Sequence, residues 1–252
     1  MPCPLALELY SVRNLYQEDF EACLAKVAAI GYAGVECFGD PMLPAERVAA
    51  ALKASGLTLV GWHTPINLLE GSLLPLTMAY FKAVGCTRAI VPWADKENFA
   101  TREATLAFAR RLMAIKSAME PYGIALGYHN HGQEFVPYQD GTLPWAYLMD
   151  NTDIIAQLDN GNAYTSGTPG LDTAALVAKW PGRAATVHLK PYAFATGHAT
   201  MIGEDDIDWP AFLAAAKDPG GAEWFIVEYE CEARYSQFEG VERCFEALKK
   251  YL

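Results

Sequence analysis

Short apolar segments alternate with longer amphipathic segments along the whole chain. Eight of the apolar segments have the length of a β-strand, because each spans four to seven residues. They cover residues 5–10, 34–38, 57–63, 89–92, 124–130, 154–159, 186–190 and 225–230. The pattern therefore predicts eight strands with helical stretches between them.

Glycines mark the ends of the clearest predicted helices. The amphipathic segments and their closing glycines are 19–30 with Gly31, 44–54 with Gly56, and 101–122 with Gly123. A glycine after the last turn suits a helix C-terminus, because it adopts the left-handed conformation without strain. In each case the next predicted strand follows directly, so one strand-then-helix unit is repeated along the chain.

Eight such units in 252 residues leave about 30 residues for each unit. This is the size of a closed (β/α)8 barrel, the TIM barrel. An open doubly wound sheet usually carries a glycine-rich phosphate loop, and neither GxGxxG nor GxxxxGKS/T occurs in the chain. The sequence also contains no linker or low-complexity stretch. We therefore predict an α/β fold, a single-domain TIM barrel over residues 1–252.

Polar residues occupy alternate positions of the predicted strands, all on the same side. In a barrel strand, alternate residues face the lumen and the surrounding helices. In residues 225–230, for example, Phe225, Val227 and Tyr229 take the outward positions. The polar residues on inward positions are Glu8, Glu36, His63, His129, His131, Gln157, Asp159, His188, Lys190, Glu228 and Glu230.

Many of these side chains lie at C-terminal strand ends, where a TIM barrel has its active site. They include four of the five histidines, whereas His198 lies in a predicted loop. Carboxylates that converge on one cavity repel each other unless a cation or a proton offsets their charge. Histidine and carboxylate ligands without cysteine indicate a divalent cation. We expect one metal ion, with Mn²⁺ placed first and Co²⁺, Zn²⁺ and Mg²⁺ left open.

Such a centre suits chemistry next to a carbonyl group. A metal with open positions binds a hydroxy-ketone and polarises its carbonyl. A flanking carboxylate then removes the proton from the neighbouring carbon. Return of the proton to another face or carbon gives epimerisation or isomerisation.

Charge and composition exclude several other classes of protein. The formal net charge is −11 and no basic patch is visible, which argues against binding nucleic acid or an anionic membrane surface. The apolar runs are far shorter than the roughly 18–20 residues of a membrane span. The start of the chain lacks the pattern of a secretion signal. Six scattered cysteines without a CxxC pair predict reduced, buried thiols in a cytoplasmic protein.

Seven phrases in a fixed order give the chain a family resemblance. They are Leu-Glu-Leu-Tyr-Ser-Val-Arg from residue 7, Gly-Val-Glu from 34, Tyr-His-Asn-His-Gly-Gln-Glu-Phe from 128, Gln-Leu-Asp-Asn-Gly-Asn from 157, Val-His-Leu-Lys from 187, Ile-Gly-Glu-Asp-Asp-Ile-Asp-Trp from 202 and Val-Glu-Tyr-Glu from 227. Over nearly its whole length the chain resembles the sugar phosphate isomerase/epimerase family of xylose isomerase-like TIM barrels, which are related in fold to endonuclease IV.

The resemblance implies a metal held by four residues from the last four strands. Asp159, His188 and Glu228 match three of the family's ligands. For the fourth, many relatives carry Glu-Asn-His where this chain has His129-Asn130-His131. We favour Glu134, three residues further on, as the ligand that reaches back to the metal, with His129 as the alternative. His131 is then a candidate acid/base or substrate contact.

Further residues are candidates for binding or catalysis. Lys190 is a candidate to stabilise an enediolate or a substrate anion, or else to pair with a neighbouring carboxylate. His63 and Glu36 are candidates to bind substrate hydroxyls. The candidates divide into possible catalytic residues (Glu134, Glu228, His131 and Lys190) and possible substrate contacts (His63, Glu36, His129, Glu230 and Trp93). Trp62 and Tyr10 are candidates, together with Trp93, for an apolar wall against which a sugar stacks.

These residues are compatible with four functions to different degrees. The leading hypothesis is a metal-dependent isomerase or epimerase acting on a keto-sugar or related polyol through an enediolate. The alternative is a lyase or dehydratase on the same site, since inosose dehydratase and enzymes that eliminate from 3-keto-glycosides resemble this pattern too. A multi-metal DNA endonuclease conflicts with five histidines and the net charge of −11. The ligand set disfavours a barrel that only binds sugar.

The substrate expected is therefore a small sugar. No arginine cluster marks a phosphate site, so phosphorylation of the substrate is not assumed. The family resemblance also allows a homo-oligomer.

Overall fold

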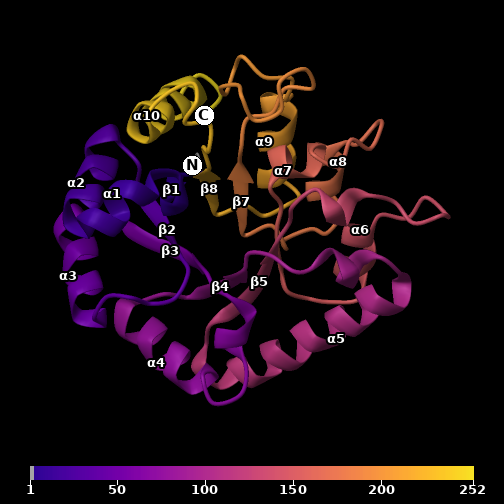
Figure 1. Cartoon of the computed structure of the whole chain (residues 1–252), viewed down its shortest axis with the longest axis horizontal. Helices are drawn as coiled ribbons and strands as arrows, with labels where there is room; N and C mark the ends of the chain where they lie inside the picture. Colours follow the sequence, from indigo (N-terminus) through magenta and orange to yellow (C-terminus); the bar gives the residue numbers. More distant parts are fainter. Residues whose placement is uncertain (1–2) are drawn as a thin grey trace.

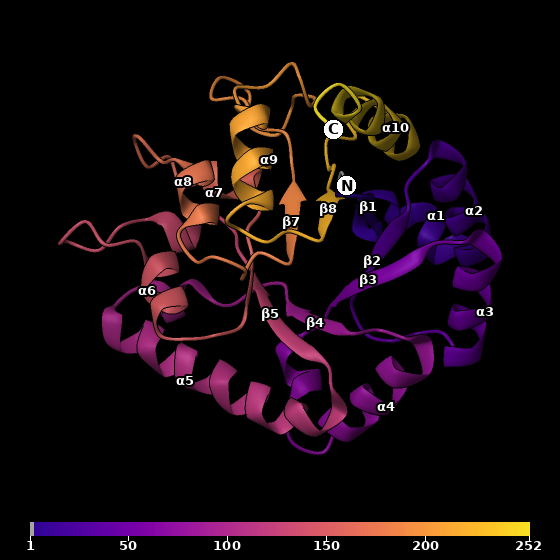
Figure 2. The same cartoon turned by 180° about the vertical axis from the view of Figure 1, so that it is seen from behind.

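The computed structural model describes residues 3–252 and contains eight parallel strands. Figure 1 shows them around a common centre with the helices outside, and Figure 2 gives the same arrangement from behind. The strands are β1 (Leu5–Glu8), β2 (Gly34–Phe38), β3 (Thr58–His63), β4 (Arg88–Val91), β5 (Ala125–His129), β6 (Ile155–Gln157), β7 (Thr186–Leu189) and β8 (Trp224–Val227). All eight predicted strands are confirmed, and the prediction of a TIM barrel is correct.

The strands form one sheet in the order β6-β5-β4-β3-β2-β1-β8-β7. β1 pairs with both β2 and β8, so the first and last units are joined. In the described part of the chain, β6 and β7 meet through a single isolated bridge between Asp159 and His188. This bridge nearly closes the barrel, and its two residues belong to the candidate metal ligands.

Ten α-helices surround the sheet in residues 3–252. They are α1 (Arg13–Glu18), α2 (Phe20–Ile30), α3 (Ala45–Ser55), α4 (Leu74–Val84), α5 (Arg102–Met119), α6 (Pro144–Asp150), α7 (Asn160–Tyr164), α8 (Thr173–Ala178), α9 (Trp209–Lys217) and α10 (Gln237–Leu248). Five 3₁₀ helices lie between them: η1 (Leu9–Val12), η2 (Ile66–Leu69), η3 (Lys96–Phe99), η4 (Glu120–Tyr122) and η5 (Gln133–Phe135). The three helices predicted from glycine caps are α2, α3, and α5 with η4.

The caps of α2 show why it begins and ends where it does. The Asp19 side chain accepts a hydrogen bond of 2.9 Å from the Ala22 backbone N–H, which satisfies one of the free donors of the first turn. Gly31 follows the last turn with a φ of 116°, in the left-handed region. A residue with a Cβ is strained there, so glycine fixes the end of the helix.

The barrel has two apolar clusters, one inside it and one between the strands and the surrounding helices. The large cluster lies between strands and helices and contains the outward strand residues Val227 and Tyr229. The small cluster, Ala6, Val60 and Ile226, fills the lumen. It forms the apolar floor beneath the polar residues at the C-terminal strand ends.

The cysteines and the helices agree with the composition. All six cysteines, Cys3, Cys23, Cys37, Cys86, Cys231 and Cys244, are buried free thiols. Among the helices of residues 3–252, none has the length and apolar character needed to cross a membrane. The start that was considered for a secretion signal includes residues 1 and 2, which lie outside the described part.

Candidate active site

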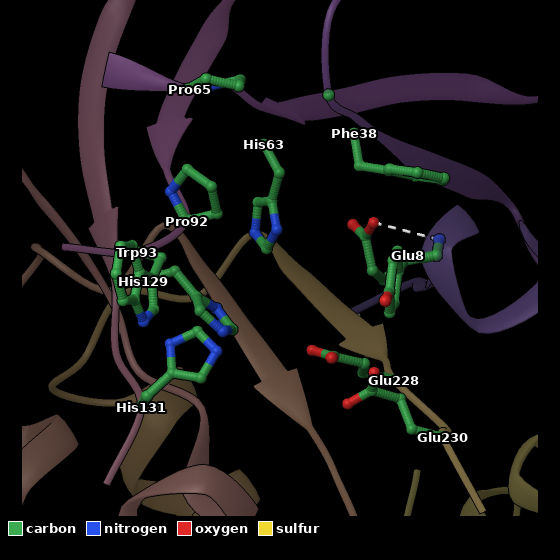
Figure 3. Close-up of a pocket in the computed structure, with 12 residues that line it drawn as sticks. Glu8, Phe38, His63, Pro65, Pro92, Trp93, His129, His131, Glu228 and Glu230 are labelled. Carbon is green, nitrogen blue, oxygen red and sulfur yellow. Dashed lines mark hydrogen bonds between the residues drawn. The ribbon is translucent and has the colours of Figure 1, made fainter. Parts of the chain in front are cut away.

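A cavity of about 330 Å³ opens at the C-terminal ends of the strands. Figure 3 shows Trp93, His129 and His131 on one side of it and Glu8, Glu228 and Glu230 on the other. Of the residues predicted to act in catalysis or to contact substrate, the cavity is lined by His63, Trp93, His129, His131, Glu228 and Glu230. The volume is within the range typical of small-molecule sites.

Four buried side chains at the edge of this cavity form a group suited to a divalent metal. His129, Asp159, His188 and Glu228 each offer one donor atom, and the four atoms lie within 4.8 Å of one another. Asp159 Oδ2 is buried and lacks a hydrogen-bond partner within residues 3–252. An unsatisfied buried carboxylate oxygen is costly. This oxygen and the nitrogen and oxygen donors around it fit the metal that the sequence implied.

His188 lies between two carboxylates. Its Nδ1–H donates to Glu228 Oε2 and its Nε2–H donates to Glu36 Oε2, both at 2.7 Å. Burial alone would lower the pKa of His188, but the hydrogen bonds and charges of Glu228 and Glu36 outweigh it and raise the pKa to about 9. The ring is therefore protonated at neutral pH, and metal binding at Nδ1 requires loss of that proton.

His129 has the opposite electrostatic setting. Burial, then the neighbouring His188 and His63, lower the pKa of His129 well below its usual value. Its Nδ1 lies 3.2 Å from Gln157 Oε1, an atom that only accepts, so the ring's proton is on Nδ1. The lone pair is then on Nε2, 3.4 Å from Asn162 Nδ2. The Asn162 amide donates this long hydrogen bond, which a metal at Nε2 would replace, and the neutral imidazole is the form that binds metals.

Asp159 is positioned by the turn that follows β6. Its Oδ1 accepts a 2.6 Å hydrogen bond from the Asn162 backbone N–H and so caps α7. Its own backbone N–H donates to Asn130 Oδ1 at 2.9 Å. Both contacts fix the carboxylate and leave Oδ2 without a hydrogen bond in the described residues, 3.9 Å from His188 Nδ1. Burial raises the pKa of Asp159 to about 7, while Lys190 opposes and Glu228 adds to that rise.

The structure does not bring Glu134 into this group. Its Oε1 accepts a hydrogen bond of 2.6 Å from the Tyr128 hydroxyl, and its Oε2 accepts one of 3.0 Å from the His131 backbone N–H. Glu134 lies in η5, which folds it back against the outward face of β5, and burial raises its pKa to about 7. In this arrangement the geometry favours the alternative, His129, over Glu134 as the strand-five ligand.

Lys190 is tied to two glutamates. Its Nζ donates to Glu228 Oε1 at 2.8 Å and forms a second ion pair with Glu230. It is almost fully buried and does not line the cavity. Burial is the largest single effect and lowers the pKa of Lys190, but the nearby carboxylates of Glu228, Asp159 and Glu230 together outweigh it and raise the pKa. This is the pairing with neighbouring carboxylates that the sequence left open for Lys190, and it orients the carboxylates that reach the cavity.

Glu36 and Gln157 form a polar layer beneath the cavity. Glu36 was predicted to touch substrate, but it is fully buried, does not line the cavity and bonds to His188 and Gln157. Gln157 Oε1 accepts from His63 at 2.8 Å and from His129 at 3.2 Å. Its Nε2 donates to Glu36 and to Thr186. Gln157 was placed inward by strand alternation, but no role was assigned to it.

The aromatic candidates divide between rim and core. Trp93 and Tyr10 line the cavity and are 50% and 40% exposed. Trp62 is buried, packs on Tyr80 and Phe81 and faces the helices, so its predicted place in the cavity wall is wrong. Side chains alternate along β3, so His63 points inward and its neighbour Trp62 points outward.

Glu8 is a cavity residue whose importance the sequence did not reveal. It was expected only to face inward from the first strand, and it lines the cavity from β1. Its Oε2 is buried without a hydrogen-bond partner in the described residues. Burial and the nearby Glu36 raise the pKa of Glu8 well above its usual value. Both effects favour the protonated form of this carboxyl group at the cavity wall.

Two further groups share His188 and also have a spacing that a metal could use. They are His63, His129 and His188, and Glu8, Glu36, His63 and His188. In both, His63 Nε2 is already engaged by Gln157 and lies 3.2 Å from Glu36. In the second group Glu36 also bonds to three side chains. The group of His129, Asp159, His188 and Glu228 contains a buried carboxylate oxygen without a hydrogen bond in the described residues, so it is the best candidate of the three for a metal centre.

Comparisons with known proteins agree with this architecture. A family model described as xylose isomerase-like TIM barrel matches residues 24–251. The fold is similar to a sugar phosphate isomerase/epimerase from Parabacteroides distasonis ATCC 8503, with 20% identity, a TM-score of 0.80, and coverage of 99% of this chain and 94% of that one.

Two other solved structures carry different activities in their names. An L-ribulose 3-epimerase has 14% identity and a TM-score of 0.72, with coverage of 99% of this chain and 94% of that one. The probable 3-DHS dehydratase AsbF from Bacillus anthracis has 11% identity and a TM-score of 0.73, with 98% of each chain covered. At these identities the likeness shows the fold. No curated protein sequence matches the chain.

Proposed function

The chain belongs to the xylose isomerase-like TIM barrel family, and we propose that it is a divalent-metal-dependent isomerase or epimerase of a keto-sugar. The observation that carries the proposal is the buried group of His129, Asp159, His188 and Glu228 beside a cavity with candidate acids and bases on opposite walls. Mn²⁺ is the first choice of metal, because the carboxylate oxygens suit it and the group contains no thiolate, and Co²⁺, Zn²⁺ and Mg²⁺ are the alternatives.

The four side chains would hold the metal, and a bound metal would polarise the substrate carbonyl as a Lewis acid. His129 is already neutral, and Gln157 fixes its tautomer. Glu228 is held in place by Lys190. The chain thus orients the donors before any ligand arrives, which is the contribution expected of residues that surround a metal site.

His131 is the proposed base. Burial lowers the pKa of His131 to about 4, so the ring is neutral, and its Nδ1 lacks a partner among residues 3–252. It lines the cavity opposite Glu8. His131 would remove the proton next to the carbonyl, and the electron pair of the broken C–H bond would pass into the enediolate. Glu8, as a protonated acid, would return a proton on the opposite face.

Elimination is the second candidate function. It begins with the same proton removal, but the electron pair then expels a leaving group from the β-carbon and leaves an unsaturated ketone. The same residues serve both reactions. The presence of an epimerase and a dehydratase among the structural neighbours supports keeping both.

Solvent exchange tests the proposal. The metal-loaded protein is incubated in heavy water with a panel of keto-sugars, and deuterium next to the ketone is followed by NMR. We expect exchange by the wild type, a loss of at least about 100-fold in His131→Ala, and no change in His198→Ala. His198 is the matched control, because it belongs neither to the cavity lining nor to the four-residue metal group.

Exchange in His131→Ala at the wild-type rate would refute its role as base. A product that has lost a substituent would favour elimination. No exchange into any keto-sugar tested would overturn the proposed chemistry.

A further inference from the structure

A second cavity adjoins the first one and shares part of its wall. The inner cavity is the one described above, and the outer cavity, of about 560 Å³, lies between α1, α2 and the segment after β2. Phe38 and Gly39 line both. The two spaces are therefore neighbouring compartments that meet at the C-terminal end of β2.

Phe38 forms the boundary between the compartments. Its ring contacts Tyr10 of the inner cavity, edge-on, at 5.2 Å between centroids. It also contacts Tyr16 of the outer cavity at 4.8 Å. Figure 3 shows Phe38 at the side of the inner cavity next to Glu8. A molecule that occupies both compartments would thus pass over one aromatic face.

The residues that line the outer cavity indicate which kind of ligand it can bind. Tyr16, Phe20 and Leu43 supply apolar surface, and Gln17 and Asp40 supply hydrogen-bonding groups. The cation in the lining, Arg47, is already held by both oxygens of Glu21 at 2.7 Å. A phosphate or carboxylate would find no unpaired cation among these described residues. A neutral group with hydroxyls and an apolar face suits such a wall.

We propose that the outer cavity binds a second sugar ring, so that the substrate is a keto-disaccharide rather than a free keto-monosaccharide. The reacting keto-sugar occupies the inner cavity, and the glycosidic oxygen lies beside Phe38. This inference rests on the proposed function and specifies its substrate class. It predicts that binding energy from the second ring contributes to the reaction at the first.

The test compares two probes and two variants of the same helix. The probes are the 3-keto forms of glucose and of maltose, followed by deuterium exchange. Gln17→Trp places a large side chain in the outer cavity at an exposed position of α1. Asn14→Trp makes the same change at another exposed position of α1 that does not line the cavity.

In the wild type, kcat/KM for exchange should be about tenfold higher for the disaccharide, the effect of roughly one good contact. Gln17→Trp should remove that advantage and leave the monosaccharide rate unchanged, whereas Asn14→Trp should match the wild type. Circular dichroism of both variants checks the fold.

Equal rates for the two probes, or an advantage that survives Gln17→Trp, would overturn the second-ring site while the proposed function stands. An advantage seen only for an aryl conjugate of the keto-sugar would also overturn it. Exchange with neither probe would count against the proposed function itself. Calorimetric titration with maltose, which cannot react, then tests the outer cavity alone: binding that Gln17→Trp abolishes supports it, and absence of binding refutes it.

Discussion

Gln157 shows how much of the site depends on one uncharged side chain. Its carbonyl oxygen accepts from two histidine rings, while its amide donates to Glu36 and Thr186. Because Glu36 accepts only, the amide cannot be reversed without losing these bonds. One residue therefore fixes the tautomers of His63 and His129 together.

Replacing Gln157 by leucine should leave both rings free to rotate and to exchange tautomers. Loss of such an orienting partner typically weakens metal binding about 10- to 100-fold. We expect an increase of this size in the Mn²⁺ dissociation constant, measured by calorimetry. Gln139→Leu, at an exposed loop position, is the control and should bind as the wild type does. Unchanged affinity in Gln157→Leu would remove its positioning role.

The strand-five ligand can be decided by a pair of substitutions. His129→Ala removes a donor from the four-residue group, so bound metal should fall at least about tenfold. Glu134→Gln should keep the metal, because both oxygens of Glu134 face Tyr128 and His131 instead. Elemental analysis of both purified variants gives the answer. Metal lost in Glu134→Gln and kept in His129→Ala would restore the original assignment.

The case of Glu134 also shows what the sequence cannot provide. Spacing after β5 places Glu134 near the metal candidates, but the direction of its side chain depends on η5. That turn depends on tertiary contacts such as the bond from the Tyr128 hydroxyl. Asp159, His188 and Glu228, in contrast, could be predicted, because strand alternation and the barrel geometry determine which way they point.

At the scale of elements, strand centres were easier to predict than strand ends. β6 was expected to reach residue 159, but it ends at Gln157 because Asp159 turns to cap α7. In β3 the pairing with β2 shifts after Val35, and Val60 joins Ala6 and Ile226 in the lumen. A β-bulge breaks simple alternation, and nothing in the local pattern announces it.

At Gly240 in helix α10, helix propensity and side-chain packing predict opposite effects of an alanine substitution. Alanine normally stabilises a helix by roughly 1 kcal/mol over glycine. At Gly240, however, a Cβ would overlap the ring of the buried Tyr229. We expect Gly240→Ala to destabilise the protein by about 1–3 kcal/mol in urea unfolding. Glu242→Ala, exposed on the same helix, should have little effect, and a stabilised Gly240→Ala would contradict the packing described.

The start of α9 gives a prediction about pH. Burial raises the pKa of Asp205 from 3.8 to about 6, against hydrogen bonds that include Trp209 Nε1. A raised carboxyl pKa favours the fold fully below pH 3.8, and this contribution is lost as the pH rises through 6.

Asp205→Asn keeps an acceptor for Trp209 and removes the buried charge. It should therefore be more stable than the wild type at pH 7–8, by an amount on the order of 1 kcal/mol because the carboxyl is partly exposed. At pH 4 the difference should largely vanish. Asp95→Asn, at an exposed position, serves as control in the same denaturation series. A constant difference at all pH values would show that the charge is not responsible.

At the scale of the whole molecule, the candidate metal centre lies at the weakest join of the barrel. β6 and β7 are linked by the Asp159–His188 bridge in the described chain, and both residues belong to the metal group. A ligand that binds only the folded state stabilises it, by about 2.7 kcal/mol at 100 times its dissociation constant. Metal should thus both stabilise the protein and close this join.

Hydrogen exchange measures that effect by region. On adding Mn²⁺, amides in residues 155–159 and 186–189 should exchange more slowly, whereas those of β2 and β3 should change little. Slower amide exchange spread evenly over the barrel would indicate general stabilisation and would argue against a metal that links β6 and β7. Faster exchange in either segment would contradict the placement of the centre.

The most direct measurement is the metal content of the purified protein before and after chelator treatment, together with that of Asp159→Ala. The account predicts about one Mn, Co, Zn or Mg per wild-type chain, its loss with chelator, and little metal in Asp159→Ala. Two or three zinc ions per chain would instead favour the multi-metal endonuclease reading. A wild-type protein that holds no metal and gains no thermal stability from any of the four would contradict the central claim.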